Sequence, residues 1–197
     1  MENKKQTILI TGAYGFVGTN ISKALKENYN LWALDIEEKK SEAYTRFFKW
    51  DDLSKIPEVN AIIHLAGKAH DTRNQTDRQV YFDINTGLTQ KIYDWFLNSN
   101  AEKFIFFSSV KAAANRVEGE YLTEDIVPAP VGPYGESKIA AENYILERQI
   151  KNYVQQSIDT SQNNQKFQTS NVKHQTKRTY ILRPSMIHGP GNKGNLN

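Results

Sequence analysis

Tyr134 and Lys138 stand four residues apart in the stretch GPYGESK, a spacing that suits acid–base chemistry. Residues at positions i and i+4 are neighbours on one face of a helix. A free tyrosine has a pKa near ~10 and is a poor base at neutral pH. A neighbouring ammonium would stabilise the phenolate and lower that pKa. The pair therefore predicts a general acid–base that exchanges a proton with a sugar or alcohol hydroxyl.

Three glycines follow the first apolar run at every third position, in TGAYGFVG. Gly12 allows a tight turn with backbone angles that other residues avoid. Gly15 has no Cβ and would let a pyrophosphate approach the backbone, and Gly18 would allow a helix to pack closely on a strand. The N-terminus of that helix would offer N–H groups and a partial positive charge to the phosphates. The pattern, G-x-x-G-x-x-G, predicts a dinucleotide site.

An acid at the end of the second expected strand distinguishes between the two nicotinamide dinucleotides. Asp35 lies 20 residues beyond Gly15. A carboxylate at this place accepts hydrogen bonds from the adenosine ribose hydroxyls and repels a 2′-phosphate, so the sequence favours NAD over NADP. The positive charge of an oxidised nicotinamide would then add to that of Lys138 in lowering the pKa of Tyr134.

Strand-like and helix-like segments alternate along the chain, and these elements must position the side chains above. Short apolar runs predict strands at 7–11, 31–35, 46–50, 61–67, 103–109 and 179–184. Helical spacing predicts helices over 15–28, 76–98 and 134–149. The alternation predicts an α/β fold, a doubly wound parallel sheet of the Rossmann type with helices on both faces. Ser109 would then end the fifth strand at the carboxyl edge, where ligands bind, and could hydrogen-bond the reacting oxygen.

Two segments interrupt this alternation within the single domain expected over 1–197. Residues 151–177 are rich in Gln, Asn, Ser, Thr and Lys, which predicts a polar, mobile insertion. The last stretch, 185–197, is typical of a loop that leaves a strand.

Composition excludes several classes of function. A formal net charge of +3 is too small to argue for a nucleic-acid partner. The chain has no cysteine, which excludes disulfides and thiol catalysis, and no histidine pair has a spacing suited to a metal. No apolar run approaches the length of a membrane span or a signal peptide, so the cytoplasm is the expected location.

Beyond these separate patterns, the chain resembles the extended short-chain dehydrogenases/reductases of the NAD-dependent epimerase/dehydratase family, which act on nucleotide sugars. The matching stretches run from residue 7 to 191: TGAYGFVG, Asp35, HLAG, Asn85 in INTG, FFSSV, YGESK and RPSMIHGPG. SSVKAAA and TEDIVPAPVGPYGESK are most similar to the branch that includes UDP-glucose 4-epimerases and related enzymes of UDP-N-acetylhexosamines.

The resemblance also implies a role for individual residues. The pyrophosphate would be held by Gly12, Gly15 and Gly18 with the backbone of Phe16 and Val17. Asp35 would bind the adenosine ribose, and Asp51 or Asp52 the adenine, with Asp51 preferred. Leu65, Ala66 and Gly67 would line the nicotinamide ribose side, with Lys68 and Asn85 close to the cofactor. Ser109, Tyr134 and Lys138 would be the catalytic trio, and Lys138 would also bind the nicotinamide ribose.

The implied reaction is hydride transfer from a carbon of a nucleotide sugar, expected to be UDP-linked, to NAD. Tyr134 would remove the hydroxyl proton, and an epimerase would return the hydride to the other face of the keto sugar. Val110 and Lys111 replace the acidic pair of dehydratases, which disfavours dehydration. Two alternatives stay open: a dehydrogenase or reductase that releases NADH, and a non-catalytic dinucleotide-binding module.

By the same resemblance, the C-terminal substrate-binding portion of the family is missing. Residues 185–197 would be the start of that portion in a truncated chain, unless the remainder lies elsewhere. Family members often dimerise through a four-helix bundle, which predicts a homodimer through 76–98 and 134–149.

Overall fold

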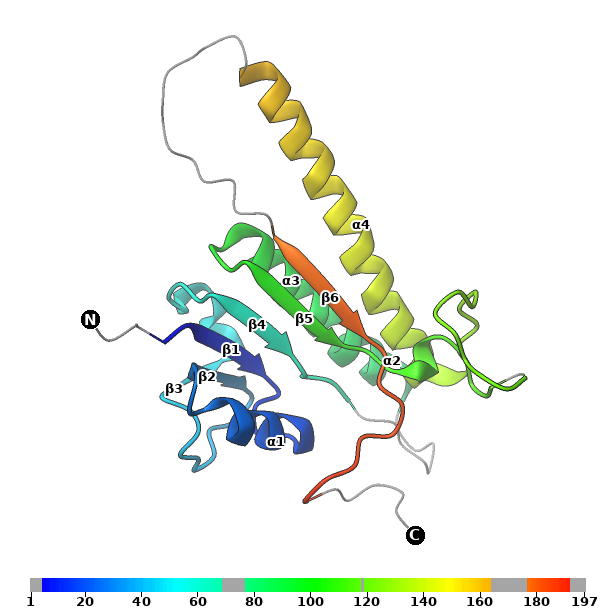
Figure 1. Ribbon diagram of the computed structural model, residues 1–197, viewed down its shortest axis with the longest axis horizontal. Helices are drawn as coiled ribbons and strands as arrows, with labels where there is room; N and C mark the ends of the chain where they lie inside the picture. The colour runs from blue at the N-terminus through cyan, green and yellow to red at the C-terminus, as the bar shows by residue number, and fades with distance from the viewer. Residues whose placement is uncertain (1–4, 69–76, 118, 164–176, 192–197) are drawn as a thin grey trace.

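Six parallel strands form the sheet in the computed structural model, which describes residues 5–68, 77–117, 119–163 and 177–191 (Figure 1). The strands are β1 (Thr7–Thr11), β2 (Asn30–Asp35), β3 (Arg46–Lys49), β4 (Ala61–His64), β5 (Lys103–Phe107) and β6 (Arg178–Leu182). Their order is β3-β2-β1-β4-β5-β6, with every neighbouring pair parallel. The predicted doubly wound sheet is confirmed, and the direction of winding reverses between β1 and β4.

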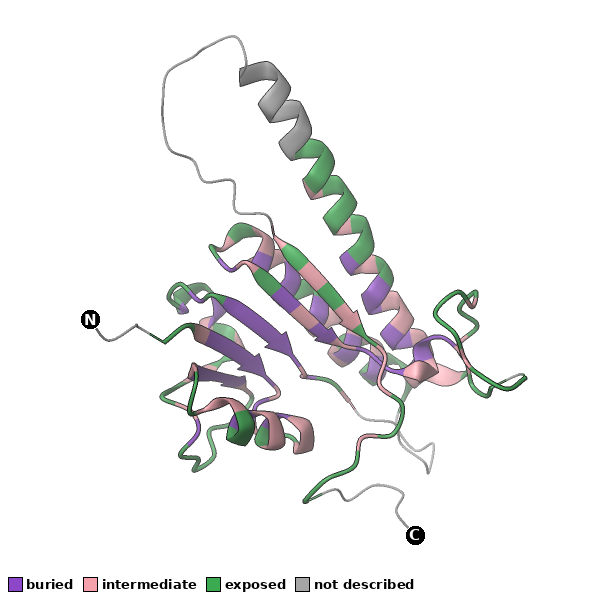
Figure 2. Cartoon of the chain, in the orientation of Figure 1, coloured by how far each residue is buried: buried purple, intermediate pink, exposed green. Residues whose placement is uncertain are grey.

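The two faces of the sheet are covered by different helices. On one face, Ile8, Ile10 and Leu31 pack with side chains of α1 (Phe16–Leu25). On the other, Leu9, Ile62, Phe104 and Phe106 pack with α3 (Leu88–Asn98) and α4 (Gly132–Asn163). Residues 8 and 9, or 62 and 63, serve opposite faces because side chains alternate along a strand. Figure 2 shows β1 and β4 buried at the centre.

The crossover from β4 to β5 contains a π-helical turn. The predicted helix over 76–98 is observed from residue 78 onward as α2 (Arg78–Tyr81), a π-helix η2 (Phe82–Gly87) and α3; residue 76 lies outside the described residues. The Asp77 side chain caps its start by accepting a 2.9 Å hydrogen bond from the Gln79 N–H. π-helical turns are rare in proteins, but those that occur are often found at functional sites. This one contains the buried Asn85.

Helix α4 is longer than the sequence predicted. It was expected to end at residue 149, but it continues to Asn163, so the first part of the predicted insertion 151–177 is helical. No glycine or proline follows Gly135 within the helix, and adding a residue to an existing helix costs little. Residues 164–176, on which the rest of that prediction falls, lie outside the described residues.

Two short 3₁₀ helices complete the described elements: η1 (Trp50–Lys55) after β3 and η3 (Val110–Ala112) after β5. None of the described helices combines the length and the apolar character that a bilayer crossing requires.

Candidate active site

The glycine-rich turn between β1 and α1 has no room for side chains at two of its three glycines. Gly12 has φ +63, and a Cβ there would lie 2.7 Å from the backbone nitrogen of Ala66. A Cβ on Gly18 would lie 2.5 Å from the Ala13 carbonyl oxygen. Gly15 is exposed and precedes the first residue of α1, with no side chain capping the helix there. The turn therefore exposes backbone at a helix N-terminus, an arrangement that binds phosphate.

The predicted backbone contributors Phe16 and Val17 form the first turn of α1 and are half-buried. The segment after β6 passes close to them, because the Asn20 side-chain amide donates to both the Phe16 carbonyl and the Pro190 carbonyl, at 2.9 and 3.2 Å. The end of the described chain thus lies beside the glycine-rich turn (Figure 1). The remainder of the predicted segment 185–197, from residue 192, lies outside the described residues.

Tyr44, which was not predicted from the sequence, stabilises the glycine-rich turn through hydrogen bonds to its carbonyl groups. The Tyr44 hydroxyl donates to the Ala13 carbonyl at 2.8 Å and lies 3.2 Å from the Gly18 carbonyl. Burial raises the pKa of Tyr44 to about 12, so it stays a donor throughout the physiological range. Tyr44 lies in the irregular connection between β2 and β3, where no periodic pattern signalled it.

The two predicted acids of the adenosine side differ in how they are held. Asp35 ends β2, and its carboxylate accepts the backbone N–H of Tyr14 at 3.0 Å, which ties it to the glycine-rich turn. Asp51 is exposed in the first turn of η1, just beyond the end of β3. Its neighbour Asp52 forms an ion pair with Lys55 at 2.7 Å. No described contact joins Asp51 to the other predicted site residues.

His64 joins the ends of β1 and β4, where the winding reverses. It is fully buried, with Nδ1 2.6 Å from the Thr11 hydroxyl and Nε2 2.9 Å from the Thr89 hydroxyl. The Thr11 hydroxyl also accepts the N–H groups of Leu65 and Ala66. His64 thus holds the two strand-end turns together as a packed residue. Ligands bind at such reversal points in α/β sheets.

Asn85 organises the predicted nicotinamide side from the π turn. Its Oδ1 accepts the Lys68 N–H at 2.7 Å, and its Nδ2 donates to the Ser137 hydroxyl at 2.9 Å. A Cβ on Gly67 would lie 2.8 Å from Asn85 Oδ1 and 3.3 Å from Lys138 Nζ. Gly67, Lys68, Asn85 and Lys138 are therefore brought together. Ser137 was not predicted, although its place three residues after Tyr134 put it on the same helix face.

The predicted catalytic trio converges where β5 ends and α4 begins. Ser109 follows β5 and is 7% exposed, and its side chain hydrogen-bonds that of Tyr134. Lys138 is 5% exposed, and its ammonium donates to the Phe107 carbonyl at 3.0 Å. The buried hydroxyl, phenol and ammonium thus share one region at the carboxyl edge of the sheet.

Burial and hydrogen bonding act on the pKa of Tyr134 in opposite directions. Burial raises the pKa of Tyr134, and the hydrogen bond with Ser109 only partly opposes this rise. Lys138 was expected to lower that pKa, but its ammonium is directed to the Phe107 carbonyl. Burial also lowers the pKa of Lys138 to about 8, and the Glu142 carboxylate partly opposes that change. Burial is therefore the largest influence of the protein on the pKa of both groups.

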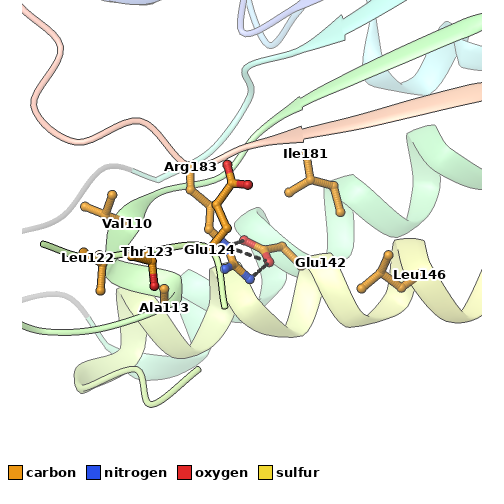
Figure 3. Close-up of a pocket in the computed structure, with 9 residues that line it drawn as sticks. All are labelled: Val110, Ala113, Leu122, Thr123, Glu124, Glu142, Leu146, Ile181 and Arg183. Carbon is orange, nitrogen blue, oxygen red and sulfur yellow. Dashed lines mark hydrogen bonds and ion pairs between the residues drawn. The ribbon is translucent and has the colours of Figure 1, made fainter. Parts of the chain in front are cut away.

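A cavity of about 460 Å³ adjoins the trio, between η3, α4 and β6 (Figure 3). Val110, Leu146, Ile181 and Arg183 contribute to its walls, and Ser109, Tyr134 and Lys138 do not. Among the described residues, no group of three or more His, Asp or Glu side chains is placed to hold a metal ion.

Solved structures share this architecture. A UDP-glucuronic acid 4-epimerase from Bacillus cereus, solved with NAD, superposes with a TM-score of 0.70 at 22% identity and covers 93% of this chain and 58% of that one. MoeE5, solved with UDP-glucuronic acid and NAD, gives a TM-score of 0.63 at 25% identity over 73% of this chain and 49% of that one.

Curated relatives are similar across the same region. UDP-glucose 4-epimerase from Vibrio cholerae is 27% identical over 212 residues, which span 97% of this chain and 55% of that protein. A putative UDP-glucose 4-epimerase from Methanocaldococcus jannaschii is 30% identical over 151 residues, 70% of this chain and 49% of that protein. The chain spans about half the length of the curated relatives it matches.

A family model described as NAD dependent epimerase/dehydratase family matches residues 8–157. The match includes the glycine-rich turn, Asn85 and all three residues of the trio. NAD, the cofactor predicted from Asp35, is the cofactor in that description. The chain belongs to the NAD dependent epimerase/dehydratase family.

Proposed function

We propose that this chain is the cofactor-binding and catalytic part of an NAD-dependent nucleotide-sugar 4-epimerase, with a UDP-linked hexose as substrate. The observation that carries the proposal is the convergence of Ser109, Tyr134 and Lys138 at the same carboxyl edge of the sheet as the glycine-rich turn. The relatives and solved neighbours named as UDP-sugar 4-epimerases support the reaction. The proposed location is the cytoplasm.

The residues present fit a dinucleotide. Gly15 is exposed, has no Cβ and directly precedes α1, which no side chain caps, so main-chain N–H groups are accessible to a pyrophosphate there. In this proposal the glycine-rich turn with Phe16 and Val17 holds the pyrophosphate, Asp35 the adenosine ribose and Asp51 the adenine. Leu65, Ala66, Gly67, Lys68 and Asn85 line the nicotinamide side, and Lys138 binds the nicotinamide ribose.

In the reaction, NAD would supply a reversible hydride acceptor at the sugar carbon. The Tyr134 phenolate would take the hydroxyl proton from the sugar and later return it. Ser109, which already hydrogen-bonds Tyr134, would hydrogen-bond the same sugar oxygen and align it. Because burial raises the pKa of Tyr134, the phenolate needs cationic charge nearby to form at neutral pH. Lys138 would provide part of that charge.

Binding and turnover can be measured separately on the intact chain. We expect calorimetry to show NAD binding and an affinity for NADP at least about tenfold lower, since Asp35 repels a 2′-phosphate. If neither NAD nor NADP produced binding heat, the proposed function would be refuted. Mass spectrometry of material released from the purified protein would identify a retained nucleotide sugar.

Turnover is tested with UDP-glucose, UDP-N-acetylglucosamine and UDP-glucuronic acid, with the epimers resolved by NMR. The variant Tyr134→Phe should lower the rate by at least about a hundredfold while NAD still binds. Tyr180→Phe, at an exposed position of β6, is the matched control and should leave the rate unchanged. Full activity of Tyr134→Phe would eliminate Tyr134 as the acid–base.

We keep a second proposal open, a dinucleotide-binding module that does not turn over by itself. NAD binding without epimerisation of any of the three sugars would support it. Steady release of NADH, followed by its fluorescence, would instead support a dehydrogenase or reductase.

We also propose a homodimer through the segments 76–98 and 134–149. Its support is a row of exposed apolar side chains at helical spacing on α4, at and beyond the end of the second segment: Leu146, Ile150, Tyr153 and Val154. Light scattering after size-exclusion chromatography should give twice the chain mass, and Ile150→Glu should give the monomer. A monomeric wild-type chain at high concentration would refute the dimer.

A further inference from the structure

Glu142 is a carboxylate buried next to the catalytic trio, and the roles described above do not use it. It is 1% exposed and accepts hydrogen bonds from two other elements. The Ser108 hydroxyl donates to Oε1, and Arg183 donates to Oε2 through Nη2 at 2.6 Å, with Nε 3.1 Å from both oxygens. Figure 3 shows the two side chains pointing toward each other across the edge of the cavity.

These contacts join the three elements that meet at the trio. Ser108 immediately precedes Ser109, Arg183 follows the last residue of β6, and Glu142 lies one helical turn after Lys138 on α4. The backbone adds to the junction, because the Ser108 N–H donates to the Leu182 carbonyl at 2.8 Å. A single carboxylate therefore fixes the ends of β5 and β6 against α4.

If Glu142 and Arg183 served only to pack the core, a buried ion pair would be an unfavourable choice, because burying charged groups has a large desolvation free energy. Removing carboxylate and guanidinium from water is often not repaid by their attraction, and apolar residues of similar size can stabilise a fold better. Arg183 also remains partly exposed, with 28% of its side chain accessible against 2% for Glu142. The negative charge of Glu142 therefore stands on the buried side, where Lys138 also lies.

We propose that Glu142 is a positioning residue of the trio: its carboxylate holds Ser108, and through it Ser109, against α4, and it places a buried negative charge one helical turn from the Lys138 ammonium. The proposal rests on the proposed function, because it gives Glu142 a role in preparing Ser109 and Lys138 for catalysis. Glu142 itself touches no reacting atom.

The ionisable groups around Lys138 agree with this role. Burial lowers the pKa of Lys138, and the Glu142 carboxylate is the group that raises it. From β4, the neutral His64 also faces Lys138, and from its own helix Tyr134 lies one turn away. Arg183 faces Glu142 and, from the loop before α4, Glu124 faces Arg183. The carboxylate of Glu142 is thus the negative charge that acts on Lys138 against its desolvation.

The test is the protonation of Lys138 in the intact chain, followed by NMR of its Cε and Nζ during a pH titration. In Glu142→Gln the midpoint should fall by about 1 pH unit, since a nearby opposite charge shifts a pKa by about that much. Glu147→Gln removes the same charge from an exposed position of the same helix and should leave the midpoint unchanged. An unchanged midpoint in Glu142→Gln would overturn the proposal.

A second measurement needs no variant, should Glu142→Gln fail to fold. In the wild-type chain the Glu142 carboxyl carbon should show a chemical-shift step at the same pH as Lys138. A flat Glu142 signal through that pH would also overturn the proposal. NAD calorimetry on the same samples separates the two claims: absence of NAD binding refutes the proposed function, whereas NAD binding with uncoupled Lys138 and Glu142 signals refutes only this inference.

Discussion

Acidification should destabilise the fold through His64, because that histidine can be accommodated only when neutral. Thr89 donates its own hydroxyl proton to the Asn85 carbonyl at 2.6 Å, so its oxygen must accept from Nε2–H of His64. Nδ1 of His64 must then accept from the Thr11 hydroxyl. A second ring proton would point at a hydroxyl that is already a donor, in a site without water access. Burial accordingly lowers the pKa of His64 to about 3.

The size of the effect follows from the two protonation states. In the unfolded chain this histidine has a pKa near ~6.5, so between that pH and about 3 the unfolded state binds the additional proton. His64 therefore contributes its full stabilisation above pH 6.5, and that stabilisation is lost as the pH falls toward 3. Between pH 8 and pH 5 the loss is about 2 kcal/mol, because one pKa unit corresponds to about 1.4 kcal/mol.

Urea unfolding at pH 8 and pH 5 measures this loss, with His64→Asn as the comparison. The asparagine keeps a neutral donor and acceptor but cannot titrate, so its free energy of unfolding should fall by about 2 kcal/mol less than that of the wild-type chain over the same range. Equal losses in the two proteins would show that His64 does not stay neutral in the folded chain, and the deduced hydrogen-bond directions would be wrong.

Three further perturbations test other parts of the structure. Gly18→Ala should weaken NAD binding in calorimetry at least about tenfold and reduce the free energy of unfolding by roughly 1–3 kcal/mol, because the added Cβ would overlap backbone atoms. Gly87→Ala is the control and should change neither quantity, because the nearest atom to its added Cβ would be 3.8 Å away. Lys177→Met should reduce stability by about 2 kcal/mol in urea unfolding, because Lys177 donates to three carbonyls at the end of α3, and the exposed Lys103→Met should change it little. Tyr44→Phe should weaken NAD binding several-fold in calorimetry through loosening of the glycine-rich turn, and unchanged affinity would remove its bracing role.

The sequence was sufficient to predict those features whose structure depends on residues that are close together in the chain. The glycine-rich turn was predictable because Gly12 needs a positive φ and Gly18 needs close backbone, both properties of the residue itself. The strands were predictable because a strand buried on both faces is a short apolar run. Tyr134 and Lys138 were predictable because helical spacing places residues four apart on one face.

Element ends and local distortions were less predictable. The end of α4 was misplaced because a polar segment without glycine or proline is compatible with both a loop and an extended helix. The π turn at Asn85 has no sequence signal, because the hydrogen bonds of Asn85 with Lys68 and Ser137 come from distant parts of the chain.

By itself, the sequence determined the α/β alternation, the glycine-rich turn after the first strand and NAD as the cofactor, and it singled out Ser109, Tyr134 and Lys138 as the proposed trio. Only the tertiary structure decided the electrostatic state of that trio. Burial raises the pKa of Tyr134 and lowers that of Lys138, and their neighbours Tyr81 of α2, Ser109 after β5 and Glu142 of α4 are brought together only by folding. The role of Glu142 is of the same kind, because a charge acts through space on groups that folding brings near, and residue spacing along the chain does not encode that distance.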